Sequence, residues 1–132
     1  MIDRNSDILV VDDVEQIRSF LRMILLKMGF VKVETSSSSK DVMERMRRKK
    51  YDLLFLDINL PGVDGLALLS LIKQKYPQTK VIMCTGNHTE QNVKEAISSG
   101  AIGFLAKPIL PASITKLFDK LKISYQGANS HM

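Results

Sequence analysis

Four short apolar runs, each ending at a charged or hydroxyl-bearing residue, constrain the fold of this chain more than any other feature. The runs cover residues 8–11, 53–56, 81–84 and 102–106. Such runs are typical of strands buried on both faces, as in a parallel sheet covered by helices. Because ligand sites of open α/β sheets lie at the carboxyl ends of the strands, the residues that follow the runs are predicted to share one site. They are Asp12, Asp13, Asp57, Thr85 and Lys107.

The segments between the runs have the spacing of amphipathic helices. A helical stripe over residues 17–28, which includes Phe20, is followed by Gly29 as a C-terminal cap, and further stripes cover 42–46, 68–72 and 88–99. The third of these four stripes includes Leu71. A last helix begins near Pro111, and a short second strand lies near residues 31–33. Strand and helix alternate five times, which predicts an α/β fold with a doubly wound parallel sheet flanked by five helices.

The helix over 88–99 is expected to be the least firmly held. Its apolar anchors are only Val93, Ala96 and Ile97, and its other positions are polar. A helix with so little apolar surface to bury contributes little to the core, so its position is the least costly to shift.

The length of 132 residues suits one domain with a substantial core. The formal net charge is +5, and much of the excess lies in residues 45–50, which include Arg45, Arg47, Arg48, Lys49 and Lys50. This run is either a patch for nucleic acid or an acidic partner, or the solvated end of a helix. The run lacks the series of stacking aromatics that a single-strand binder would require, so we favour the second interpretation and expect no direct nucleic-acid binding.

The chain has neither a signal-peptide pattern nor an apolar stretch of about 20 residues, the length needed to span a bilayer. We therefore expect a cytoplasmic protein that does not interact with membranes. The single cysteine, Cys84, lies inside an apolar run and is expected to be an inert buried thiol.

The predicted site has the parts needed for phosphoryl transfer. Three neighbouring carboxylates repel one another in a partly desolvated cleft, and a divalent cation relieves this repulsion. Oxygen ligands favour Mg²⁺ over Zn²⁺, which prefers histidine or cysteine. An aspartate can also accept a phosphoryl group as an acyl phosphate. The Thr85 hydroxyl, the Lys107 ammonium and the Gly86 N–H are suited to neutralise the charge of the incoming group.

These residues resemble the response-regulator receiver domain of two-component signalling, of the chemotaxis-regulator type. The resemblance covers about residues 6–123 and rests on four motifs: residues 11–13, 57–65, 85–86 and 107–108. It implies a flavodoxin-like sheet with strand order 2-1-3-4-5, and it leaves residues 1–5 and 124–132 as flexible tails.

The resemblance also implies a role for each site residue. Asp57 is the phosphoacceptor, and Thr85 and Lys107 bind the phosphoryl group. Asp13, Asp57 and the Asn59 carbonyl hold Mg²⁺, with Asp12 acting through water. Thr85 and Phe104 form the switch, and the Lys107–Pro108 bond is cis.

The leading functional hypothesis is a phosphorylation-controlled switch that receives its phosphoryl group from a histidine kinase or phosphotransfer protein. It would catalyse only its own phosphotransfer and autodephosphorylation, with Asn59 and Asn87 flanking the attacking water. The output surface is expected on the helix over 88–99, the strand over 102–106 and the helix after Pro111. Gly103 stands where one subgroup of the family has a dimer-forming aspartate, so we expect a monomer or a weak phosphorylation-dependent dimer.

Two alternatives remain open at this stage. The chain could be a receiver domain from a larger regulator with a DNA-binding or enzymatic output. It could also be an aspartyl-phosphate phosphatase of the haloacid-dehalogenase type. That enzyme class requires a second aspartate two residues after the nucleophile, where this chain has Asn59. It also requires a cap, for which the chain has no room.

Overall fold

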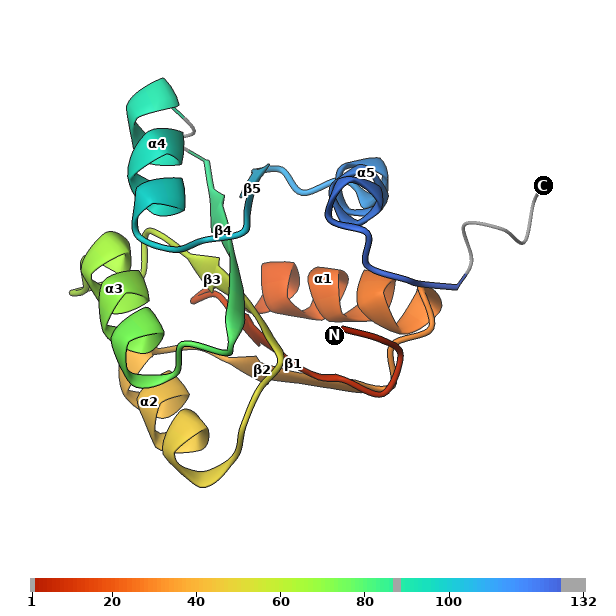
Figure 1. The fold of residues 1–132 in the computed structure, drawn as a ribbon, viewed down its shortest axis with the longest axis horizontal. Coiled ribbons are helices and arrows are strands. Elements are labelled where there is room, and N and C mark those ends of the chain that lie inside the picture. The colour runs from red at the N-terminus through yellow and green to blue at the C-terminus, as the bar shows by residue number, and fades with distance from the viewer. Residues whose placement is uncertain (1, 87–88, 127–132) are drawn as a thin grey trace.

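The computed structural model describes residues 2–86 and 89–126 and contains one parallel sheet with helices on both faces (Figure 1). The strand order is β2-β1-β3-β4-β5, as expected, and every neighbouring pair is parallel. The elements are, in chain order, β1 (Asp7–Val11), α1 (Glu15–Lys27), β2 (Lys32–Ser36), α2 (Ser39–Arg48), β3 (Leu53–Asp57), α3 (Gly65–Lys75), β4 (Lys80–Thr85), α4 (Glu90–Ser98), β5 (Gly103–Ala106) and α5 (Pro111–Leu121).

Burial separates the central strands from the edge strands. β3 is buried along its whole length, and β1 and β4 are buried at every residue except the first. In β2 and β5 buried and half-buried residues are interspersed, because each has a neighbouring strand on one side only. The uninterrupted apolar runs of the sequence are therefore explained by helices that cover both faces of the central strands.

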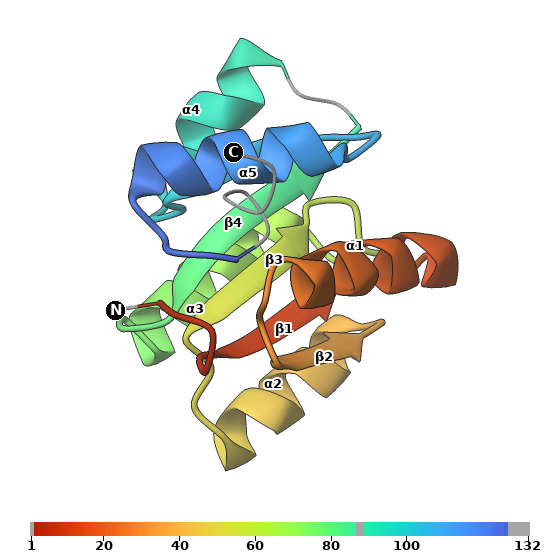
Figure 2. The same cartoon turned by 90° about the vertical axis from the view of Figure 1, so that its right-hand side faces the viewer.

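The two faces of the sheet have separate cores. α1 and α5 cover one face, where Ile8, Val10 and Phe55 pack with Phe118 (Figures 1 and 2). α2, α3 and α4 cover the other face. Its core includes Leu9, Leu54, Leu56 and Met83. Successive side chains of a strand point to opposite faces, so each strand supplies both cores.

The helix ends follow the expected local chemistry. The Ser38 side chain accepts a hydrogen bond from the Asp41 N–H at the start of α2, and Asp64 caps α3 in the same way. Gly29 and Gly100 follow α1 and α4 with φ of 97° and 107°, a conformation that glycine adopts without strain. Pro111 occupies the first turn of α5.

Three apolar residues predicted on inward-facing helical stripes are exposed instead. Phe20, Leu71 and Ile97 have exposed fractions of 41%, 39% and 47%. Each is adjacent in sequence to a buried residue of the same helix, and so lies about 100° away from it around the helix axis. The buried stripes are therefore narrower than the sequence suggested. In α4 only Ala96 is buried, so this helix is held even less firmly than expected.

The described parts of both chain ends pack against the body of the protein. Ile2 contacts the core beneath α1 and α5, and the Tyr125 ring lies 6.2 Å from the Phe118 ring. The Gln126 N–H donates to the Met28 carbonyl over 2.6 Å. Ile2 and Tyr125 thus lie against the core at positions that the motifs left in the expected tails. None of the described helices has the length and apolar character needed to cross a membrane.

Candidate functional site

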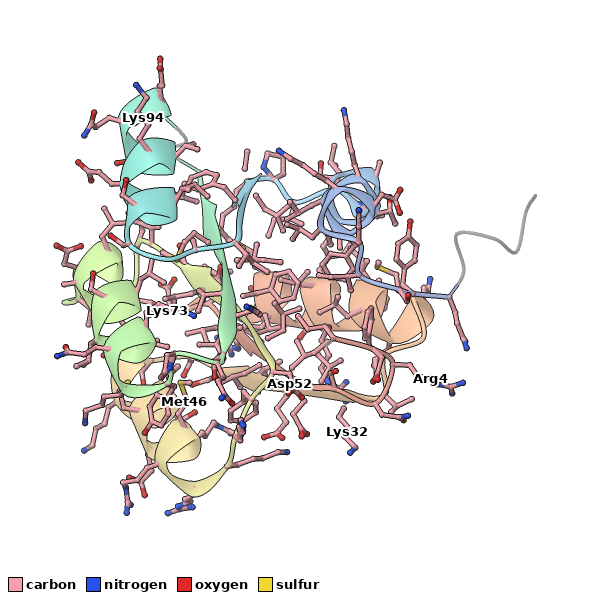
Figure 3. The ribbon with its side chains drawn as sticks, viewed as in Figure 1. Arg4, Lys32, Met46, Asp52, Lys73 and Lys94 are labelled. Atoms are coloured by element: carbon pink, nitrogen blue, oxygen red, sulfur yellow. The ribbon has the colours of Figure 1, made fainter. Side chains whose placement is uncertain are left out.

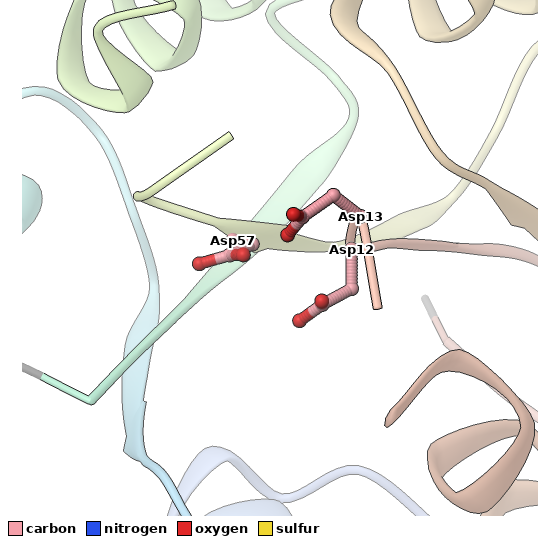
Figure 4. A group of neighbouring side chains, drawn as sticks. All are labelled: Asp12, Asp13 and Asp57. Carbon is pink, nitrogen blue, oxygen red and sulfur yellow. The ribbon is translucent and has the colours of Figure 1, made fainter. Parts of the chain in front are cut away.

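Three carboxylates meet at the carboxyl edge of the sheet. Asp12 and Asp13 directly follow β1, and Asp57 is the last residue of the neighbouring strand β3. Their ligand oxygens lie within 4.8 Å of one another (Figure 4). Asp12 and Asp57 are each only 2% exposed, whereas Asp13 faces solvent. The parallel register, which places Val11 beside Leu56, brings residues 45 positions apart into one cluster.

Lys107 reaches this cluster from the carboxyl end of the edge strand β5. It directly follows β5, and its Nζ lies 2.6 Å from Asp12 Oδ2 and 3.2 Å from Asp57 Oδ2. Burial disfavours the ammonium, but the hydrogen bond to Asp12 and the charges of both carboxylates outweigh it and raise the pKa of Lys107. Lys107 is therefore a fixed cation at neutral pH.

The cluster keeps more negative charge than Lys107 can neutralise. Burial is the largest influence on Asp57 and, together with the charge of Asp12, raises the pKa of its carboxyl group. The Asn59 N–H and the Lys107 ammonium oppose this shift without cancelling it. Three carboxylates against one ammonium leave a site in which a further cation would be stabilised.

Backbone hydrogen bonds orient the two buried carboxylates. Asp12 Oδ1 accepts from the Val14 N–H over 2.9 Å, and Asp57 Oδ1 accepts from the Asn59 N–H over 3.0 Å. In each case the second oxygen contacts Lys107. Arg18, which sequence reasoning did not select, donates from Nη1 to the Asp12 carbonyl over 2.7 Å. Its position six residues after Asp12, on a helix, gave no motif by which to find it.

Thr85 and Asn59 are joined by a hydrogen bond that the sequence did not predict. Thr85 is the last residue of β4 and is completely buried. Its Oγ1 accepts a hydrogen bond from Asn59 Nδ2 over 2.9 Å, across a separation of 26 residues. Asn59 thus contacts Asp57 through its backbone N–H and Thr85 through its side chain. Asn87, expected to flank the path of an attacking water, lies outside the described residues.

The remaining predicted residues lie around the cluster. Phe104 is half-buried on β5 and packs against the core beneath α2, α3 and α4. The Lys107–Pro108 bond is cis, as the resemblance implied. Gly86 is exposed, and a Cβ at its position would meet no atom within 4 Å. Cys84 is buried, and burial raises the pKa of its thiol, so it is inert as expected.

The donor set suits a hard divalent cation. The cluster offers carboxylate oxygens only, without histidine or cysteine among its members. Oxygen ligands of this kind favour Mg²⁺, Ca²⁺ or Mn²⁺ over Zn²⁺. The acidic cluster can therefore hold a cation of this class.

Comparison with known proteins agrees with the geometry. Residues 8–119 match the response regulator receiver domain family. The chain is 33% identical over 113 residues to the chemotaxis protein CheY of Bacillus subtilis. This alignment covers 86% of this chain and 94% of the relative. It is 38% identical over 103 residues to a protein-glutamate methylesterase/protein-glutamine glutaminase of Archaeoglobus fulgidus, covering 76% of this chain but 29% of that protein.

The fold leads to the same family. A CheY-like response regulator receiver domain protein from Methanospirillum hungatei superposes with a TM-score of 0.79 at 28% identity, covering 89% of this chain and 94% of the other. A family match over most of the chain outweighs the phosphatase alternative considered from the sequence. The chain therefore belongs to the response regulator receiver domain family, the signalling domains of two-component systems.

Proposed function

We propose that this protein is a phosphorylation-controlled switch whose phosphoacceptor is Asp57. The observation that supports this most directly is the placement of the buried Asp57 carboxylate beside two further carboxylates and the Lys107 ammonium. In the proposed step an Asp57 oxygen forms a bond to phosphorus while the bond from phosphorus to the donor's leaving group breaks. The electron pair of that bond goes to the leaving group.

The charges around Asp57 are suited to this transfer. Lys107 would pair with the transferred phosphoryl oxygens, and the Thr85 hydroxyl and the Gly86 N–H would donate to them. We propose that Asp13, Asp57 and the Asn59 carbonyl hold Mg²⁺, with Asp12 acting through water. A bound Mg²⁺ supplies positive charge that offsets the repulsion among the carboxylates and the incoming group. The protein would catalyse only its own phosphotransfer and its own dephosphorylation.

The switch would connect Thr85 to α4 through Phe104. Thr85 ends β4, Phe104 lies on the adjoining strand, and α4 covers the same face of the sheet. Movement of Thr85 toward a phosphoryl oxygen would vacate space that Phe104 can occupy. Since only Ala96 anchors α4 in the core, this helix is the element most easily displaced. We place the output surface on α4, β5 and α5, which carry Lys94, Glu95, Lys116, Asp119 and Lys120.

The proposed partners follow from the family. A histidine kinase or phosphotransfer protein would supply the phosphoryl group in the cytoplasm, and an output protein or domain would bind the α4–β5–α5 surface. We expect a monomer or a weak dimer formed on phosphorylation. Relatives that consist almost entirely of this domain and relatives in which it is a small part are both known. The output could therefore reside in a separate protein or in the same chain.

The decisive experiment is incubation with acetyl phosphate or phosphoramidate, with and without Mg²⁺, followed by intact mass measurement. The wild type should gain the mass of one phosphoryl group only when Mg²⁺ is present. Asp57→Asn should gain none, because the amide is not a nucleophile for phosphorus. A matched control is Asp119→Asn, since the exposed Asp119 only accepts a hydrogen bond from Tyr125, which an asparagine oxygen preserves. Equal labelling of Asp57→Asn and wild type would disprove the assignment.

A second variant tests the switch separately from the phosphoacceptor. Thr85→Ala should still gain the phosphoryl mass but should not transmit the change to α4. Amide hydrogen exchange of residues 89–106, with and without phosphorylation, measures this transmission. Equal responses in the wild type and Thr85→Ala would rule out the Thr85 route while leaving Asp57 as the phosphoacceptor.

A further inference from the structure

A basic groove lies at the amino ends of the strands, at the opposite end of the sheet from the carboxylate cluster. The chain segments at the C-terminal ends of α2 and α3 together line a volume of about 470 Å³ there. Its walls are residues 46–50 and 75–79. The first segment leads into β3 and the second into β4, so the groove is at the amino ends of the strands. A partner bound there would leave the carboxyl edge of the sheet open.

The groove has a strong excess of positive charge. Five of the ten residues that line it are cations, and none of the ten is acidic. Neighbouring carboxylates pair with only some of them: Arg47 and Arg48 share Glu44, and Lys49 pairs with Glu34 and Asp7. The side chains of Arg47 and Arg48 are 68% and 73% exposed, so their ion pairs are weak and readily exchanged for another anion.

Two further lysines of the groove have no carboxylate partner among the described residues. Lys50 donates to the neutral side chain of Gln78 over 2.7 Å, and Lys75 is exposed in the last turn of α3. These two side chains, which come from separate segments of the chain, are available to an anionic ligand.

The floor of the groove is apolar. Met46 is 3% exposed and, as Figure 3 shows, lies between α2 and the lower end of α3. The half-buried Tyr76 and the exposed Pro77 complete this surface. Tyr51 follows the basic run directly in the sequence but is 2% exposed, whereas the fold brings the half-buried Tyr76 to the groove from the end of α3. A ligand that combines negative charge with an apolar group would therefore contact both parts of the groove.

The surroundings argue against a small phosphate and against a nucleic acid. Phosphate sites use the N–H groups and positive dipole of helix N-termini, whereas two helix C-termini meet here. Single-stranded nucleic acid requires successive aromatic platforms along a track, and Tyr76 is the one aromatic side chain lining this groove.

We propose that this groove is a docking site for an acidic peptide segment of a protein partner, with one apolar side chain on the Met46–Tyr76 floor and flanking carboxylates on the cationic rim. The complementarity of charge commits the site to an acidic partner, and the floor supplies affinity that charge alone would lack. The groove and the carboxylate cluster lie at opposite ends of the strands, so a bound peptide would not cover Asp57.

The test is a titration of isotopically labelled protein with a synthetic pentapeptide of four glutamates around a central leucine, followed by amide chemical shifts. We expect the largest shifts at residues 46–50 and 75–79. A peptide with alanine in place of leucine should bind more weakly, and one with lysines in place of the glutamates should not bind. A single-stranded oligonucleotide serves as the competing polyanion. Tighter binding of the oligonucleotide than of the peptide at the groove would overturn the proposal.

Charge-reversal variants locate the site. Arg48→Glu combined with Lys75→Glu should weaken peptide binding by about tenfold or more, because two of the five cations that line the groove are reversed. The matched control combines Lys27→Glu with Lys32→Glu, two exposed cations outside the groove, and should change binding by less than about twofold. The double variant Lys50→Ala/Lys75→Ala leaves the ion pairs of α2 intact. Its peptide affinity provides a second test of the site if the charge-reversal variant unfolds. Equal losses in groove and control variants, or no binding by the wild type at millimolar peptide, would refute the docking site.

Discussion

Removal of the Lys107 ammonium should destabilise the metal-free protein strongly. Lys107→Met keeps an unbranched apolar side chain but leaves Asp12 and Asp57 without their cation. Both carboxylates are 2% exposed, so water replaces the lost contacts of 2.6 and 3.2 Å only in part. Removing one partner of a buried ion pair costs about 3–5 kcal/mol. Because the Lys107 side chain is 18% exposed and the cleft opens to solvent at Asp13, we expect a smaller loss of about 2–3 kcal/mol.

The assay is urea and thermal unfolding in the absence of divalent cations. For a chain of this size, such a loss lowers the melting temperature by about 6–15 °C. Lys94→Met is the matched control, since its ion pair with Glu90 joins side chains that are 69% and 84% exposed. That variant should lose less than about 0.5 kcal/mol. Saturating Mg²⁺ should reduce the loss in Lys107→Met, because it supplies another cation to the same carboxylates.

A double-mutant cycle separates the two ion pairs of Lys107. The double variant Asp57→Asn/Lys107→Met should lose about 1–2 kcal/mol less unfolding free energy than the two single variants lose together. In the cycle with Asp12→Asn this difference between the double variant and the sum of the single variants should be larger, because the contact of Lys107 with Asp12 is the shorter of the two. Strict additivity in both cycles, or a Lys107→Met loss no greater than that of Lys94→Met, would refute the electrostatic account of this site.

Three further outcomes follow from the structure. Asp13→Ala should leave metal-free stability unchanged or raise it by up to about 1 kcal/mol, while thermal shift with added Mg²⁺ should no longer detect stabilisation. Gly65→Ala should lose about 2–3 kcal/mol in urea unfolding, because a Cβ there would lie 2.3 Å from the Ile58 carbonyl oxygen. Gly86→Ala, whose Cβ meets open space, is the control and should be neutral. Phe118→Ala should lose about 3–5 kcal/mol, since the ring is fully buried in the core beneath α1 and α5; a loss under 1 kcal/mol would contradict that packing.

The strands and the main site residues could be predicted from the sequence because their signals are local. An apolar run that stops at an aspartate, threonine or lysine marks a buried strand and its carboxyl end without knowledge of its neighbours. Parallel pairing then forces those ends to one edge, which is why Asp12, Asp57 and Lys107 could be expected together before any distance was known. The cap at Gly29 was similarly predictable, since a helix end has its own residue preferences.

The tertiary structure alone decided features that depend on side chains distant in the sequence. The hydrogen bond from Asn59 to Thr85 and the contact of Arg18 with the Asp12 carbonyl have no sequence signal, because each depends on where two elements pack. The width of the buried stripe on each helix also depends on its neighbours, so Phe20 and Ile97 could not be recognised as exposed. The same holds for the basic groove: the run at residues 45–50 was visible, but only packing of α2 beside α3 brought Tyr76 to it. Local patterns determine elements and their ends, whereas contacts between elements are set by packing of the whole chain.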